Sequence, residues 1–110
     1  MNIKALNKLL LVIEEFRIID PQLPQQMAAV LIYVCGHNGC SVKDIENGLG
    51  MSQSSASRNA AALSSTHRSG KNGFGLIQEQ TDFEDARRKL LFLTPQGKRI
   101  AETLSHLMES

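Results

Sequence analysis

The sequence predicts a mainly α fold with a small β-hairpin, and three observations lead to this prediction. Apolar residues recur at spacings of three and four near both ends of the chain and in its first third, as they do in amphipathic helices. Two short helical patterns meet at a tight turn within residues 41–63. Two strand candidates, 76–80 and 89–93, then precede a last helix. This order is that of a winged helix-turn-helix (α+β) in a single domain, residues 1–110.

The first helix is predicted over residues 1–19, and Asp20-Pro21 ends it. Apolar residues follow one another along this helix at helical spacing: Ile3, Leu6, Leu10 and Ile13. Further apolar residues extend the apolar surface around more than one face: Leu9, Leu11 and Val12. One small core cannot cover so much apolar surface, so we expect a second copy of the chain to cover the rest.

The second helix is predicted over residues 24–35, with Pro24 in its first turn. Its inner row is apolar: Met27, Val30, Leu31 and Val34. The segment that ends it, CGHNGC at residues 35–40, has three open interpretations: a zinc site that uses Cys35, His37 and Cys40, a redox switch of the two thiols, or a plain helix end. The plain end is favoured, with Gly36 or Gly39 in the left-handed conformation, because a fourth zinc ligand is missing nearby.

The helix-turn-helix is predicted over residues 41–63. Ser41 is placed to cap its first helix, with Asp44 as the acid of a capping box, and Ser52 is placed to cap the second. Three residues of the second helix are expected to pack inward: Ala56, Ala60 and Leu63. The residues expected to face outward are Gln53, Ser54, Ser57, Arg58 and Ala61.

The second half of the chain begins with a loop, 65–74, which is rich in Ser and Gly and carries Arg68 and Lys71. Residues 81–88 join the two strand candidates and form the predicted wing. Thr94 is placed to cap the final helix, which Pro95 opens.

Charge is distributed unevenly along the chain, although the formal net charge is only +1. Residues 50–101 carry eight Lys or Arg against four Asp or Glu, a balance of +4, whereas the remainder carries four against seven, a balance of −3. A DNA-binding protein needs positive charge only on the face toward the phosphates. The asymmetry therefore supports a nucleic-acid partner.

Membrane and enzyme functions are not favoured. No apolar run approaches the roughly 20 residues that span a bilayer, and no cleavage site follows the N-terminal apolar stretch, so we expect a cytoplasmic protein without a membrane partner. The acids Asp82, Glu84 and Asp85 fall in an exposed turn, where nothing would shift their pKa values toward catalysis. Phosphate loops, nucleophile motifs and complete metal sets are missing, so we expect no enzyme activity and no cofactor.

Four short motifs occur in a fixed order: MSQSSASR at residues 51–58, GLI at 75–77, DARR at 85–88 and LTPQG at 93–97. Together they resemble the MarR family of winged-helix transcriptional regulators over about residues 23–104. The chain is shorter at both ends than typical members, and the loop 65–74 is an insertion relative to them. In this compactness it looks like phage or mobile-element regulators.

The resemblance implies a homodimeric, sequence-specific regulator of transcription, of the repressor type, that binds double-stranded DNA. Residues 1–19 and 95–109 would be its dimerisation helices. The recognition helix, 52–65, would enter the major groove and the wing, 81–88, would border the minor groove, with Asp85 orienting Arg87. The predicted DNA-binding residues are Ser52, Gln53, Ser54, Ser57, Arg58, Arg68, Lys71, Arg87 and Arg88. No particular small-molecule effector is indicated.

Plainer interpretations stay open beside this one. Arg58 can grip guanine O6 and N7, or it can be a solvated helix arginine; Ser52 can be only a cap; residues 87–89 can be only a charged face. A winged helix can also serve protein contact, as an anti-repressor or assembly adaptor. Acidic or apolar residues on the outer face of the second helix would favour that function, whereas this face carries Gln, Ser and Arg.

Overall fold

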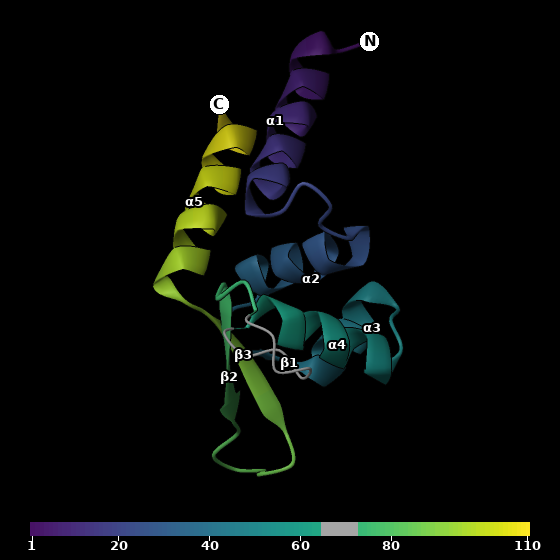
Figure 1. Ribbon diagram of the computed structural model, residues 1–110, viewed down its shortest axis with the longest axis vertical. Coiled ribbons are helices and arrows are strands. Elements are labelled where there is room, and N and C mark those ends of the chain that lie inside the picture. The colour runs from purple at the N-terminus through teal and green to yellow at the C-terminus, as the bar shows by residue number, and fades with distance from the viewer. Residues whose placement is uncertain (65–72) are drawn as a thin grey trace.

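The computed structural model describes residues 1–64 and 73–110, which form five helices and a three-stranded antiparallel sheet. The helices are α1 (Ile3–Ile19), α2 (Gln25–Gly36), α3 (Val42–Leu49), α4 (Gln53–Leu63) and α5 (Pro95–Glu109), and the strands are β1 (Cys40–Ser41), β2 (Ile77–Thr81) and β3 (Lys89–Leu93). The molecule is 48 Å long; α1 and α5 lie side by side at one end with both termini, and the β2–β3 hairpin projects from the other (Figure 1). Within the described ranges, no helix has the length and apolar character to cross a membrane.

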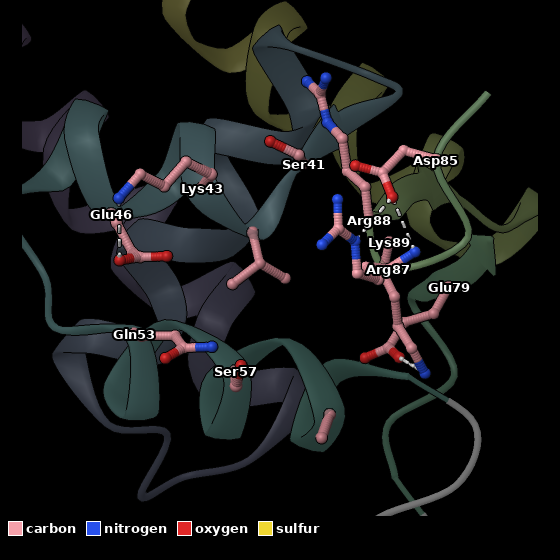
Figure 2. Close-up of a pocket in the computed structure, with 12 residues that line it drawn as sticks. Ser41, Lys43, Glu46, Gln53, Ser57, Glu79, Asp85, Arg87, Arg88 and Lys89 are labelled. Carbon is pink, nitrogen blue, oxygen red and sulfur yellow. Dashed lines mark hydrogen bonds and ion pairs between the residues drawn. The ribbon is translucent and has the colours of Figure 1, made fainter. Parts of the chain in front are cut away.

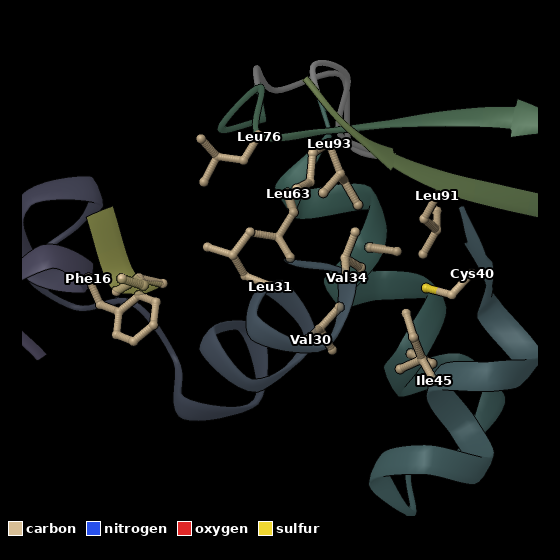
Figure 3. Close-up of a cluster of buried hydrophobic side chains, with 14 residues drawn as sticks. Phe16, Val30, Leu31, Val34, Cys40, Ile45, Leu63, Leu76, Leu91 and Leu93 are labelled. Atoms are coloured by element: carbon tan, nitrogen blue, oxygen red, sulfur yellow. The ribbon is translucent and has the colours of Figure 1, made fainter. Parts of the chain in front are cut away.

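The hydrophobic core surrounds α2 (Figure 3). Val30, Leu31 and Val34 are fully buried, as predicted for the inner row of this helix, and Met27 packs at the edge of the core. Further fully buried side chains come from α3, α4, the sheet and the residue before β2, among them Ile45, Ala56, Ala60, Leu63, Leu76, Ile77 and Leu91. The helix-turn-helix and the sheet therefore share one core, which fixes α4 relative to the hairpin.

Three helices begin at the capping residues that the sequence predicts. Ser41 Oγ accepts the Asp44 N–H (3.1 Å), and Asp44 Oδ2 accepts the Ser41 N–H (2.9 Å), which completes the capping box of α3. Ser52 caps α4 through the Ser55 N–H (3.2 Å). Thr94 caps α5, and Pro95 occupies its first position. At the end of α3, Gly50 adopts φ +65°, a conformation that favours glycine.

The prediction of a simple β-hairpin is incomplete, because the hairpin has a third strand. β1 pairs with β3, with Cys40 opposite Leu91 and Ser41 opposite Leu90. Two residues are too few for an alternating pattern to be visible in the sequence. Their pairing ties the start of α3 to β3 of the hairpin.

Several predicted boundaries and one orientation are corrected. Pro24 is the N-cap of α2 rather than its first residue, α4 spans Gln53–Leu63 rather than 52–65, and Thr81 belongs to β2, so that the wing loop is 82–88. Ala61 is buried and does not face solvent. Residues 74–76 hydrogen-bond to the end of α4, including Leu76 N–H to the Leu63 carbonyl (2.8 Å), so the last turn of this helix is covered.

The capping box gives the fold a pH-dependent contribution. The hydrogen bond from the Ser41 N–H holds the pKa of Asp44 below its ordinary value, and the charges of Arg88 and His37 act in the same direction. A lowered folded-state pKa stabilises the fold above the unfolded-state value, and this stabilisation is lost as the pH falls through the folded-state pKa. We therefore expect Asp44→Asn to lower the melting temperature at pH 7, and the difference from the wild type to disappear as the pH falls below the ordinary aspartate pKa of about 3.9 and through the lowered folded-state value.

Thermal unfolding followed by circular dichroism between pH 2.5 and 7 measures this difference. Glu102→Gln, an exposed change on α5, serves as the control and should leave the pH profile of stability unchanged. A constant difference between Asp44→Asn and the wild type at every pH would contradict the assigned role of the carboxylate.

Candidate nucleic-acid interface

A groove of about 920 Å³ separates the helix-turn-helix from the hairpin (Figure 2). One wall comes from the start of α3 and from α4, and the other from β2, β3 and the wing. The residues that line it are Ser41, Val42, Lys43, Glu46, Gln53, Ser57, Ala61, Glu79, Asp85, Arg87, Arg88 and Lys89. Polar and charged side chains of two separate structural units thus face one hollow.

The outer face of α4 is polar because the helix buries its small residues. Ala56 and Ala60 pack against the core, which leaves Gln53, Ser54 and Arg58 exposed. The first turn of α4 contains no acid, so its partial positive charge is not neutralised by a neighbouring side chain of that turn. In the described part of the chain, no carboxylate lies within ion-pair distance of Arg58, whose guanidinium is thus available to an external anion.

The wing loop is ordered by its own hydrogen bonds. The Asp82 N–H donates to the Arg88 carbonyl (2.8 Å), and the Arg88 N–H donates to the Asp85 carbonyl (2.9 Å). The two aspartates also accept backbone N–H groups two residues further on, from Glu84 to Asp82 (2.9 Å) and from Arg87 to Asp85 (3.0 Å). These bonds close a compact loop that presents Arg87 to solvent.

The basic run at residues 87–89 divides into three different environments. The Arg87 side chain is 93% exposed, and its Nε lies 3.4 Å from Asp85 Oδ1, the residue predicted to orient it. Arg88 is only half exposed and lies 3.9 Å from both Asp44 and Asp82, while Lys89 pairs with Glu79 at 3.6 Å. Arg87 is therefore the cation of this run that protrudes furthest.

Solved structures of MarR-type regulators resemble this arrangement. A Staphylococcus aureus MepR–DNA complex superposes with a TM-score of 0.71 at 21% identity, over 87% of this chain and 71% of that one. A MarR transcriptional regulator from Methanosarcina mazei gives 0.70 at 15% identity (89% and 63%), and MarR itself gives 0.63 at 18% identity (99% and 77%). The chain has the MarR-type winged-helix fold. Family models and curated protein sequences, by contrast, give no match.

The MarR-type fold brings only part of the predicted site to the groove. Gln53, Ser57, Arg87 and Arg88 line it. Ser52, Ser54 and Arg58 lie outside its lining, on the exposed side of α4 and its cap. Arg68 and Lys71 lie outside the described residues, as does most of the loop 65–74.

Other residues of this winged helix were missed from the sequence. Lys43 lines the groove from α3 and lies 3.8 Å from Glu46, and a helical wheel places it opposite the buried Ile45. Lys89 and Glu79 could not be identified because their contact joins two strands. Phe83 is fully exposed in the wing loop, and a lone aromatic residue among acids is a signal that the sequence did contain.

The segment 35–40 follows the plain interpretation most closely. His37 stacks on Tyr33 with ring centroids 4.1 Å apart, and its Nδ1 hydrogen-bonds to the Tyr33 carbonyl (2.9 Å), so one ring nitrogen is already engaged by the backbone. Burial raises the pKa of both Cys35 and Cys40, and the charge of Asp44 raises that of Cys40 further, which disfavours the reactive thiolate. Among residues 1–64 and 73–110, no three His, Cys, Asp or Glu side chains are grouped so as to hold a metal. Gly39, at φ +92°, supplies the left-handed residue.

Proposed function

We propose that this chain is a sequence-specific, double-stranded-DNA-binding regulator of transcription that acts as a homodimeric repressor. The observation that carries the proposal is that Gln53 and Ser57 of α4 and the exposed Arg87 of the wing border the same groove. The likeness to a structure that contains MepR and DNA supports it. A dimer bound at an operator would repress by excluding other proteins from that DNA.

The outer face of α4 has the chemistry needed to read bases. The major groove, about 12 Å wide, admits a helix, and the short side chains of Ser54 and Ser57 allow the α4 backbone to approach it closely. Gln53 can bind adenine N6 and N7, and Arg58 can bind guanine O6 and N7. We assign Ser52 to the helix cap, from which its backbone faces the phosphates. Arg68 and Lys71 remain predicted phosphate contacts.

The wing supplies a second contact at a fixed distance from α4. Because the wing loop is closed by hydrogen bonds of its backbone N–H groups, the wing backbone loses little conformational freedom when Arg87 enters or borders the minor groove. Arginine is favoured there since narrow minor grooves carry a strongly negative potential.

The proposed dimer is supported by apolar side chains that the single chain leaves exposed. On α1, the row that the sequence places at helical spacing does not face the core: Ile3, Leu6, Leu10 and Ile13 are 48–69% exposed. Beside it lies an apolar groove of about 490 Å³ that includes Leu9, Ile32 and Met108. A two-fold partner would cover this surface and set two α4 helices to meet major grooves about 34 Å apart.

Arg58→Ala and Arg87→Ala test the proposal. We expect each to weaken binding to an operator selected from random duplexes by about tenfold to a hundredfold, because each removes one charged contact of the kind worth about 1–3 kcal/mol. Fluorescence anisotropy at several salt concentrations measures the affinity. Lys4→Ala is the charge-matched control, since Lys4 lies near the N-terminus at the far end from the wing (Figure 1), and should bind as the wild type does.

Two outcomes would contradict this function. The first is unchanged affinity in both arginine variants while Tm and oligomeric state are retained. The second is failure of the selection to recover any duplex bound better than random DNA at moderate salt, which would instead favour the protein-contact function of a winged helix.

A further inference from the structure

We propose that Arg88 is a positioning residue, which holds the wing at a fixed angle to the helix-turn-helix and does not itself contact DNA. The inference rests on the DNA-binding function proposed above, but its structural part can be tested without DNA. Arg88 thereby takes a different role from its neighbour Arg87, although the sequence predicts both as DNA-binding residues.

The Arg88 guanidinium lies between carboxylates of two different structural units. Its terminal nitrogen is 3.9 Å from Asp44 Oδ2 in α3, and its Nε is 3.9 Å from Asp82 Oδ2 in the wing loop. Arginine suits this place because its planar fork can engage two carboxylates at once. Arg88 is one of the residues that line the groove (Figure 2).

Both carboxylates are already fixed by backbone hydrogen bonds. Asp44 Oδ2 accepts the Ser41 N–H in the capping box, and Asp82 Oδ1 accepts the Glu84 N–H. Neither acid is therefore free to follow the guanidinium if the wing moves. An arginine between two anchored acids restrains the angle between the units that carry them, even though each exposed ion pair is individually weak.

The backbone of Arg88 is anchored on the same two sides. Its N–H and its carbonyl close the wing loop, through Asp85 and Asp82. Two residues further along β3, Leu90 pairs with Ser41 of β1, directly before α3. Arg88 is thus the residue at which the wing, the sheet and the cap of α3 meet.

This setting also explains why Arg88 is the poorer DNA contact. Its side chain is 50% exposed, against 93% for Arg87, and the two acids neutralise its charge. A phosphate would have to displace both acids, whereas Arg87 faces solvent one residue earlier. The effect of Arg88 on DNA binding therefore acts through the placement of Arg87.

The structural part is tested on the free protein by amide hydrogen exchange in Arg88→Ala, Arg88→Lys and the wild type. Without the guanidinium, the amides of Asp82 and Arg88 should exchange about threefold faster, the scale of an exposed ion pair, while the amides of α2 keep their rates. Lysine can engage only one acid at a time and should restore part of the protection. Unchanged exchange at both amides in Arg88→Ala would overturn the proposal.

The DNA part is tested by the salt dependence of affinity for the selected operator. A positioning role predicts that Arg88→Ala weakens binding about threefold to tenfold with an unchanged slope of log affinity against log salt, whereas loss of a phosphate contact lowers that slope by about 1. Asp44→Asn keeps an oxygen for the cap and removes the charge that faces Arg88. Well below the melting temperature of every variant, this substitution should weaken binding on its own but add no loss when it is combined with Arg88→Ala. A slope lowered by about 1, or additive losses in the double variant, would overturn the proposal. If the wild type binds no duplex specifically, the proposed function fails, and the amide exchange rates alone decide the role of Arg88.

Discussion

Gly97→Ala is expected to destabilise the fold by about 3 kcal/mol or more, because the site has no room for a methyl group. Alanine normally stabilises a helix relative to glycine, by about 1 kcal/mol. Here a Cβ on Gly97 would overlap the Leu76 carbonyl oxygen and would lie 3.3 Å from a methyl of Leu93. The Leu76 carbonyl cannot move away without weakening a hydrogen bond, since it accepts the Thr94 N–H at 3.1 Å. The steric clash therefore outweighs the higher helix propensity of alanine, and the substitution lowers the free energy of unfolding.

Urea unfolding followed by circular dichroism measures this loss. Gly36→Ala is the matched control, because Gly36 is also in a helix and a Cβ there meets nothing within 4 Å. It should unfold at the same urea concentration as the wild type or at a higher one. Equal stability of Gly97→Ala and the wild type would show that α5 does not pack against the segment before β2 as described.

Leu6→Lys is expected to convert the proposed dimer to a monomer at micromolar concentration. Leu6 belongs to the exposed row of α1 and is 48% exposed in the single chain. In a two-fold dimer the substitution occurs twice, and each copy places an ammonium group in an apolar contact. A loss on the order of 3 kcal/mol corresponds to a dissociation constant raised by more than a hundredfold.

Leu11→Lys is the matched control for this prediction. Leu11 is 50% exposed on the same helix, and five residues of α-helix place it about 140° away from Leu6. Sedimentation equilibrium should find Leu11→Lys dimeric and Leu6→Lys monomeric, with unchanged circular dichroism in both. A wild-type chain that is monomeric at every concentration, or a Leu6→Lys variant that still dimerises, would contradict the proposed interface.

The sequence predicts those parts of the fold that depend on neighbouring residues. The caps at Ser41, Ser52 and Thr94 are confirmed, because a cap is made by side chains three residues away or fewer. The inner row of α2 is confirmed because helical periodicity alone defines it. β1 was missed and Ala61 was misplaced, since the pairing of one and the burial of the other depend on segments far along the chain.

In the candidate site, too, local features are predicted correctly and long-range contacts are missed. Helical geometry correctly places Gln53, Ser54 and Arg58 on an exposed face of α4. The run at residues 87–89 could not be resolved into its separate environments, because the partners of Arg88 and Lys89 come from α3, the wing and β2. The charged residues can be counted in the sequence, but only the folded structure shows which of them are paired with carboxylates from distant segments.

Ser41 belongs to the sheet and to a helix at once. Its backbone pairs with Leu90 in β3, while its hydroxyl group begins α3. If α4 and its cap were transplanted without the hairpin, α3 would therefore lose part of what holds it in place. A chimera designed to test the proposed DNA-binding function should exchange residues 40–93 as one unit, with its junctions before β1 and after β3.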